Sequence, residues 1–201
     1  MMYQPTPALE IKDGVFKTKI EGLYYLSYKF SIDERGFFAE VGYTHKIEAV
    51  TGQPFKVAQV NHSRSGPNVV RGLHAEGWNK LTTVINGLAF SALADVRPES
   101  PTFGQVETFE FGPDNGGLKG SLYIFQGIAN SVCVLKAPVD YIYCVDKLYR
   151  DRDVKGDQSI SLFDPDLKIA WPVARDKMII SQRDKDAITL RQKFPDKFQL
   201  V

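Results

Sequence analysis

The sequence predicts an all-β protein, an antiparallel barrel or sandwich of the jelly-roll kind. Its strand-like segments are rich in Val, Ile, Phe, Tyr and Thr, which favour a pleated backbone. Gly, Pro, Asn and Asp separate these segments, as they do at turns. Many short strands at such spacing are typical of antiparallel sheets that close on themselves. The expected strands are 22–32, 54–61, 80–96, 104–112, 120–127, 130–137 and 139–149.

Helices are expected at only two places, residues 38–52 and the tail near 183–193. Both are short, so they are predicted to lie at the periphery. A chain of 201 residues suits one domain, here 1–201. Its last part, from about residue 150, is more polar and irregular, and we expect it to wrap the barrel and not to form a second domain.

The charge balance argues against a nucleic-acid or membrane-surface protein. Lys and Arg number 25 and Asp and Glu 24, so any anionic ligand must be met by a local cluster of cations. No signal peptide and no run of 18 apolar residues is found. Cys133 and Cys144 are predicted to be reduced thiols within strands. Together these features favour a cytoplasmic protein.

The three histidines do not form a metal-binding pattern. His45, His62 and His74 include no pair with the one-residue spacing that puts two ligands on the same face of a strand. His45 lies in a predicted helix. The prediction is therefore that no metal is bound.

The segment 54–61 carries polar residues where a barrel wall is expected. Gln59 and Asn61 share one face by alternation, whereas His62 faces the other way or leaves the strand end. The simplest interpretation is a satisfied amide pair in the core. Because buried amides need partners, a polar ligand is the alternative interpretation.

The stretch RGLHAEGWNK (71–80) joins a histidine to two basic residues. Strict alternation would put Arg71 and His74 on opposite faces, but a bulge at Gly72 could turn both inward. A lone strand histidine is more often structural than catalytic. Lys80 and Arg71 nearby favour a ligand site, since so polar an interior is costly without one.

Several motifs in this order resemble those of the dTDP-4-dehydrorhamnose 3,5-epimerase family, a metal-independent branch of the cupins. The resemblance runs from about residue 20 to 190. The motifs are DERGFFAE (33–40), QVNHSRS (59–65), NVVRGLH (68–74), DVRPESPTFG (95–104), LYIFQGIAN (122–130), DYIY (140–143), DPDLKIAWP (164–172) and SQRD (181–184). The resemblance implies a cupin jelly roll, an epimerase, no cofactor, and a homodimer.

The resemblance also implies roles for individual residues. His74 of RGLH would be the catalytic base, Tyr143 of DYIY the general acid, and Asp184 of SQRD the carboxylate that orients the histidine. Imidazole suits a base because its ordinary pKa is about 6.5. Tyr141 shares a face with Tyr143. The residues implied in substrate binding are Arg35, Glu40, Gln59, Asn61, Arg71, Lys80, Asn130 and Arg183, with Glu40 supplied by a neighbouring subunit.

Three positions depart from the pattern common in that family. Asn130 stands in ANSV where many members have histidine, and Arg183 stands where lysine is common. IFQG (124–127) replaces IPEG and could alter the wall around the sugar or base. The acid–base set is intact, so these changes bear on which sugar is bound.

The expected reaction is inversion of C3 and C5 of dTDP-4-dehydro-6-deoxy-D-glucose, giving dTDP-4-dehydro-L-rhamnose. The alternatives are a C3 or C5 mono-epimerase of a related nucleotide-linked 4-keto sugar, a sugar-nucleotide-binding cupin without activity, and a metal-dependent cupin. The expected partners are the dTDP-linked 4-keto-6-deoxy sugar and a second copy of the chain.

Overall fold

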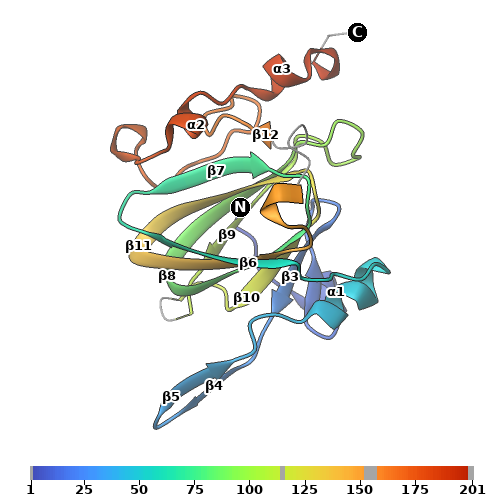
Figure 1. The fold of residues 1–201 in the computed structure, drawn as a ribbon, viewed down its shortest axis with the longest axis vertical. Coiled ribbons are helices and arrows are strands. Elements are labelled where there is room, and N and C mark those ends of the chain that lie inside the picture. The colour runs from blue at the N-terminus through green and yellow to red at the C-terminus, as the bar shows by residue number, and fades with distance from the viewer. Residues whose placement is uncertain (1, 114–115, 152–157, 199–201) are drawn as a thin grey trace.

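The computed structural model describes residues 2–113, 116–151 and 158–198, and strands dominate it (Figure 1). The strands are β1 (Glu10–Lys12), β2 (Val15–Lys17), β3 (Leu23–Ser27), β4 (Phe30–Asp33), β5 (Gly36–Ala39), β6 (Gln59–Ser65), β7 (Val70–Ala75), β8 (Lys80–Asp95), β9 (Val106–Phe111), β10 (Gly120–Ile124), β11 (Ile128–Val145) and β12 (Gln158–Ser159). The α-helices are α1 (Thr44–Thr51), α2 (Gln182–Lys185) and α3 (Leu190–Lys193). Among the described residues, single 3₁₀ turns lie at Pro7–Leu9, Tyr149–Asp151, Arg175–Lys177 and Pro195–Lys197. The predicted all-β jelly roll is confirmed.

Two long strands, β8 and β11, run through both halves of the barrel. The first part of β8 pairs with β10 and with the end of β11, whose other neighbour there is β6. The second part of β8 pairs with β9 and with the start of β11, which also pairs with β7. All of these pairings are antiparallel. The two halves therefore form two sheet layers that share their central strands.

A register shift lets β8 and β11 pass from one layer to the other. Their pairing slips between Val134 and Tyr141. Gly87 of β8 sits opposite with φ +80°, and a Cβ there would lie 2.3 Å from the Pro138 carbonyl oxygen. Only glycine fits this conformation and this close approach. The sequence predicted two strands, 130–137 and 139–149, but the structure has one bulged strand because β8 pairs on both sides of the break.

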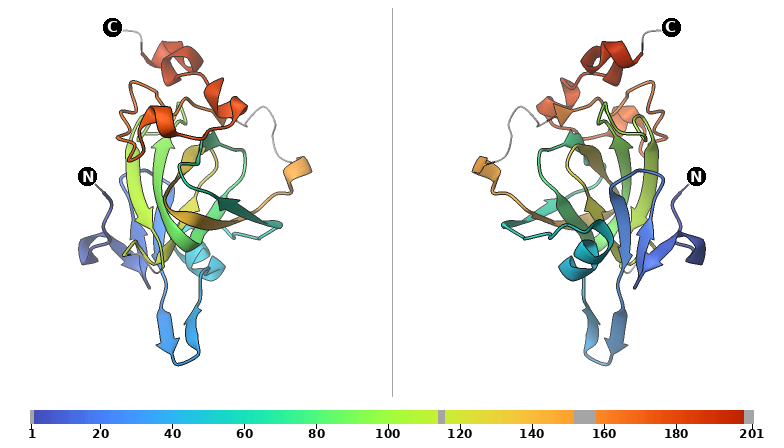
Figure 2. Two further views of the ribbon diagram at one scale, coloured as in Figure 1. Left: turned by 90° about the vertical axis from the view of Figure 1, so that its left-hand side faces the viewer. Right: turned by 90° about the vertical axis from the view of Figure 1, so that its right-hand side faces the viewer.

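The apolar side chains divide between the barrel interior and its outer face. Leu23, Phe109 and Leu122 are fully or almost fully buried inside the barrel. A second cluster joins Phe90, on the outer face of β8, to residues 158–198, which are called the C-terminal segment below. Leu162 and Leu190 of this segment are buried. Views from both sides show this segment across one end of the barrel, with α2 and α3 within it (Figure 2). The single-domain assignment of 1–201 stays a prediction.

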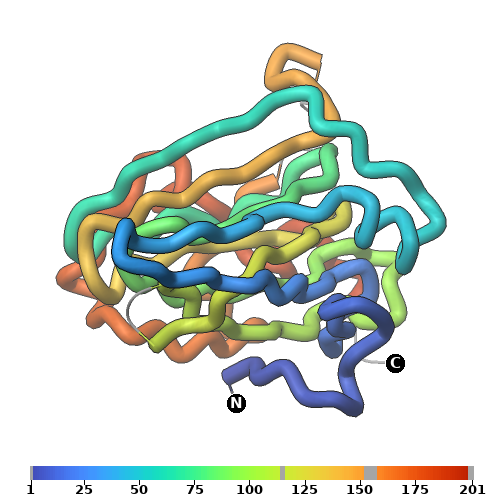
Figure 3. The backbone as a smooth tube through the Cα atoms, turned by 90° about the horizontal axis from the view of Figure 1, so that it is seen from below, coloured from blue at the N-terminus to red at the C-terminus, as the bar shows by residue number. Residues whose placement is uncertain are grey.

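The β4–β5 hairpin projects away from the barrel at the end opposite the C-terminal segment (Figures 1 and 2). It forms a separate two-stranded sheet, and in the view from below it lies in front of the barrel strands (Figure 3). Ile32, Phe37 and Phe38 are exposed by 73%, 54% and 66%. Three large apolar side chains on a projecting hairpin are costly in an isolated chain.

The structure changes the bounds of other predicted elements by several residues. The helix expected at 38–52 is α1 alone, because residues 36–39 pair with β4. The strand expected at 54–61 begins only at Gln59 and continues to Ser65. Cys133 and Cys144 are free thiols, as predicted. No helix among the described residues is long and apolar enough to cross a membrane.

Candidate active site

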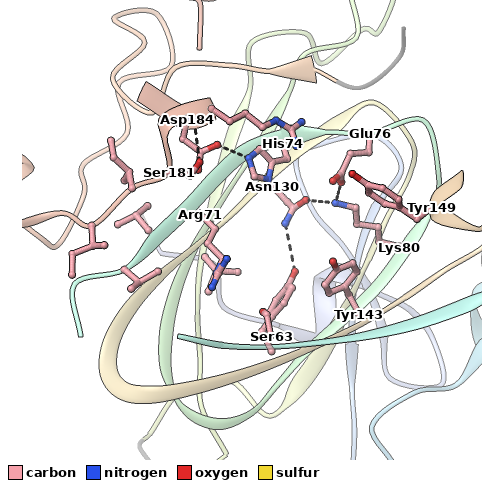
Figure 4. Close-up of a pocket in the computed structure, with 17 residues that line it drawn as sticks. Ser63, Arg71, His74, Glu76, Lys80, Asn130, Tyr143, Tyr149, Ser181 and Asp184 are labelled. Atoms are coloured by element: carbon pink, nitrogen blue, oxygen red, sulfur yellow. Dashed lines mark hydrogen bonds and ion pairs between the residues drawn. The ribbon is translucent and has the colours of Figure 1, made fainter. Parts of the chain in front are cut away.

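A cavity of about 460 Å³ opens between the two sheet layers, and both polar and apolar side chains line it (Figure 4). Strands β6, β7, β8 and β11 supply most of the lining, and residues 179–181, 183 and 184 of the C-terminal segment close one side. A volume of this size suits a small organic ligand.

Arg71 and His74 both line the cavity, although strict alternation would separate them. Gly72 lies between them with φ +129°, and the pairing of β7 with β11 shifts between Asn130 and Val132. A Cβ on Gly72 would lie 2.8 Å from the Asn130 carbonyl oxygen. The irregularity at this glycine therefore turns both side chains inward, as the sequence predicted.

His74 pairs with Asp184 across more than a hundred residues of sequence. The distance from His74 Nε2 to Asp184 Oδ1 is 2.6 Å. Asp184 lies in the first turn of α2, where the Ser181 hydroxyl accepts a hydrogen bond from the Asp184 backbone N–H. The pair lies within the cavity, where 23% of the His74 side chain is exposed.

The electrostatics of the pair fix the role of each imidazole nitrogen. Burial acts to raise the pKa of the Asp184 carboxyl, but hydrogen bonds from His74, Ser181 and the Gly72 N–H outweigh it and lower the pKa. Asp184 is therefore a carboxylate that accepts from Nε2–H. Nδ1 is left as the basic nitrogen of the ring.

Lys80 lies deep in the cavity, where it contacts Glu76 and Asn130. Its ammonium forms an ion pair with Glu76 and donates to Asn130 Oδ1 at 2.7 Å. Only 7% of the Lys80 side chain is exposed. The same ammonium lies 5.9 Å from the centre of the Tyr143 ring. A cation held so deep can stabilise negative charge that develops on a bound ligand.

Two tyrosines of β11 face the cavity side by side. Tyr141 and Tyr143 are opposite Ser63 and Asn61 of β6, and their ring centres lie 5.8 Å apart. Burial raises the pKa of Tyr143, Arg71 opposes that effect, and Tyr149 adds to it. Burial also raises the pKa of Tyr141, which is more enclosed. Both phenols therefore keep their protons at neutral pH and can donate them.

Gln59 and Asn61 share one face of β6, as predicted, and that face is the less exposed one, but neither is among the residues that line the cavity. The Gln59 amide donates to Asn61 Oδ1 at 2.6 Å, and Gln59 Oε1 accepts from the Tyr149 N–H. Arg183 and Asn130 do line the cavity, and Arg183 donates to the Ser159 hydroxyl. Residues 124–127 do not line it.

Arg35 and Glu40 lie elsewhere in the chain. Arg35 is at the tip of the β4–β5 hairpin, where it pairs with Asp33, and Glu40 accepts from the Tyr43 hydroxyl beyond β5. Neither lines the cavity of its own chain. The structure therefore does not bring these two together with His74.

Sequence reasoning missed several cavity residues. Glu76 is the most consequential, because a buried carboxylate beside Lys80 changes the charge of the site. Its spacing of four from Lys80 carried no signal, since the two residues flank a turn between strands. Tyr149 and Ser63 also line the cavity. Alternation from Asn61 would have found Ser63, whereas nothing local points to Tyr149.

Metal ligation has no candidate in the part of the chain that the structure describes, where no group of three or more His, Cys, Asp or Glu side chains could hold an ion. The absence of a metal in this protein stays a prediction.

Comparison with known proteins identifies the fold and its chemistry. The family model for dTDP-4-dehydrorhamnose 3,5-epimerase matches residues 17–192. The chain belongs to this family. The enzyme of that name from Shigella flexneri is 33% identical over 87% of this chain and 97% of its own length. A structure of the Legionella pneumophila epimerase in complex with dTDP-4-keto-L-rhamnose has a TM-score of 0.79 at 31% identity, and covers 92% of this chain and 98% of that one.

Membership of the dTDP-4-dehydrorhamnose 3,5-epimerase family makes the chain a carbohydrate epimerase. The family also contains enzymes that invert one centre. A dTDP-4-dehydrorhamnose 3-epimerase from Streptomyces niveus is 28% identical over 86% of this chain and 82% of its own. Family membership therefore leaves the number of inverted centres open.

Proposed function

We propose that the chain inverts C3 and C5 of dTDP-4-dehydro-6-deoxy-D-glucose to give dTDP-4-dehydro-L-rhamnose. The observation that carries the proposal is the pairing of a carboxylate-held histidine with a phenol from the other sheet layer, around a single cavity. Relatives that share about a third of the sequence carry the name of this reaction.

The chemistry follows from the acidity of the substrate. Protons on C3 and C5 are acidified because both carbons are alpha to the C4 ketone. His74 Nδ1 takes one proton and the C–H electron pair forms an enolate, while Asp184 stabilises the imidazolium. Lys80 stabilises the negative enolate oxygen. Tyr143 then gives its proton to the opposite face of the carbon, and solvent returns both groups to their starting states.

Nucleotide binding is assigned to cations and amides at the cavity and its edge. Arg71, whose guanidinium donates to Ser65 at 3.0 Å, and Arg183 are the cavity cations without a carboxylate partner among the described residues. They would hold the diphosphate. Gln59 and Asn61 offer amide groups that suit a base. Asn130 would contact the sugar.

A homodimer would complete the site. Arg35 and Glu40, on and beside the hairpin, lie outside the cavity of their own chain. The exposed Ile32, Phe37 and Phe38 give the hairpin a reason to pack on a second copy. We expect the hairpin of one subunit to bring Arg35 and Glu40 to the cavity of the other.

NMR of dTDP-4-keto-6-deoxy sugars in D₂O tests the reaction. Deuterium at both C3 and C5, with both centres inverted, is the expected result. Deuterium and inversion at one centre alone would assign the chain as a mono-epimerase, an alternative that the relative from Streptomyces niveus supports. Deuterium at neither centre would leave only a binding function.

Sedimentation tests the dimer. The wild type is expected to sediment as a dimer and Phe37→Asp as a monomer that binds dTDP more weakly. A matched control is Glu48→Gln on α1, another exposed side chain that lies outside the hairpin. A monomeric Phe37→Asp chain with undiminished affinity and turnover would contradict the proposal.

A further inference from the structure

A largely enclosed carboxylate lies inside the cavity without a part in the acid–base chemistry. Glu76 follows the end of β7 and only 15% of its side chain is exposed. Its carboxylate contacts the ammonium of Lys80, which donates on another side to Asn130 (Figure 4). Burying two charges costs free energy unless the groups are well oriented and hydrogen-bonded. A functional role for the Glu76–Lys80 pair would explain why the chain keeps it.

We propose that Glu76 is a positioning residue that fixes the direction and the charge of Lys80 for enolate stabilisation. The inference rests on the proposed function, in which Lys80 stabilises the enolate oxygen, because it gives Glu76 a role through Lys80. Glu76 acts through Lys80 and exchanges no proton with the substrate.

Glu76 and Asn130 both act on the direction of the Lys80 ammonium. An ammonium has three donors on a flexible stem. Glu76 and Asn130 fix two of these directions, and this stops rotation of the ammonium about the last bond of the side chain. Asn130 is fixed in turn, because its Oδ1 accepts from Lys80 while its Nδ2 lies 3.5 Å from the Tyr141 hydroxyl. Electrostatic stabilisation depends on such preorganisation.

Removing the charge of Glu76 from the Glu76–Lys80 ion pair should affect turnover and nucleotide affinity differently. Glu76 and Lys80 together are neutral, so the attraction of an anionic nucleotide falls to the arginines at the cavity. Removing the Glu76 charge makes the interior more positive. Nucleotide affinity is therefore expected to hold or rise, while turnover falls because the ammonium is no longer held in place. A merely structural role for Glu76 would lower both together.

The experiment compares Glu76→Gln, Glu76→Asp, Lys80→Met and the Glu76→Gln/Lys80→Met double variant. Glu76→Gln keeps the shape and loses the charge, and we expect kcat to fall by about 10- to 100-fold with dTDP affinity unchanged or tighter. Glu76→Asp keeps the charge and should recover part of the loss. The double variant should be no slower than Lys80→Met, because Glu76 acts only through Lys80. Glu48→Gln is the matched control.

Each outcome decides the inference. Turnover of Glu76→Gln within about twofold of the wild type overturns it. So do losses that add fully in the Lys80→Met background, or a dTDP affinity that falls in parallel with turnover. If Glu76→Gln does not fold, the double variant and Glu76→Asp carry the comparison. A wild type that exchanges no substrate proton overturns the proposed function and this inference with it, whereas an active wild type beside an unaffected Glu76→Gln overturns the inference alone.

Discussion

Two histidine–aspartate pairs lie on different sheet layers of the barrel, one on its outer surface and one facing the cavity. Outside, His62 Nε2 lies 2.7 Å from Asp140 Oδ1, and inside, His74 Nε2 lies 2.6 Å from Asp184 Oδ1. The two contacts are almost equal in length. The two pairs differ in the charged partners of their aspartates and in the exposure of their histidines.

The outer carboxylate is already neutralised. Arg64 forms two hydrogen bonds to Asp140, and Asn86 adds a third partner. Hydrogen bonds from Arg64 and His62 lower the pKa of Asp140 strongly. The His62 side chain is 54% exposed. A histidine in this position shares its aspartate with an arginine and faces open water.

The inner carboxylate has only the histidine as an ionisable partner among the described residues, with Ser181 and the Gly72 N–H as further donors. His74 lines a cavity and is 23% exposed. The comparison teaches that the pair itself does not define a catalytic base. What distinguishes the inner pair is an enclosed cavity beside it and a carboxylate whose charge is not already balanced by arginine.

Replacing each of the two histidines with asparagine should give the largest difference in turnover. His74→Asn is expected to lower turnover by about 10²- to 10⁴-fold, the usual contribution of a general base. Solvent deuterium exchange at C3 and C5 should fall with it, and dTDP affinity should remain. His62→Asn is the matched control and should keep wild-type turnover. Exchange at the wild-type rate in His74→Asn would remove His74 from the role of base.

The second-largest difference in turnover is expected between variants of the two aspartates. Asp184→Asn is expected to lower turnover by about 10²- to 10³-fold, because an amide neither stabilises the imidazolium nor selects the tautomer that leaves Nδ1 basic. Asp140→Asn should change turnover little. The measurement is kcat for both variants at saturating substrate. Equal losses in the two variants would mean that the inner aspartate has no special part in the reaction.

The two inner tyrosines sharpen the comparison within the cavity. Tyr143→Phe is expected to lower formation of inverted product by about 10²-fold, since the general acid is lost. Solvent exchange should fall less, because His74 can still remove and return a proton on the same face. Tyr141→Phe is the control, as Tyr141 contacts Asn130 and Thr82 instead. Full epimerisation by Tyr143→Phe, with loss in Tyr141→Phe, would assign the acid to Tyr141.

Local pattern predicted much of this cavity because its strands obey alternation. Asn61 and His62 were assigned to opposite faces from period two alone, and the structure has them so. Gly72 signalled the bulge that brings Arg71 and His74 together. Each of these inferences needs only the neighbours of a residue along its own strand.

Long-range contacts account for what local pattern could not supply. The pairing of His74 with Asp184 came only from family resemblance, since a helix 110 residues away carries the carboxylate. The union of 130–137 and 139–149 into β11 depends on pairing with β8, which outweighs the turn propensity of APVD. The ion pair of Glu76 with Lys80 depends on how the turn after β7 folds back into the barrel.

The smallest expected effect concerns the outer pair and the stability of the fold. Arg64 and His62 hold the pKa of Asp140 below its unfolded value of about 3.9, so Asp140 stabilises the folded chain above that pH. The contribution is lost as pH falls through the folded-state pKa. Arg64 is 67% exposed, which weakens its part by solvent screening.

Asp140→Asn should therefore lower the melting temperature by only about 2–4 °C at pH 7. That difference should persist down to about pH 4.5 and shrink below pH 4, where the unfolded wild type takes up the proton that the folded state resists. Thermal unfolding of the wild type and of Asp140→Asn across this range provides the test. Asn86→Ala, which removes the neutral hydrogen bonds to Asp140 and to the Pro138 carbonyl, is the uncharged comparison. A difference that stays constant to pH 3 would show that the outer pair acts by packing and not by charge.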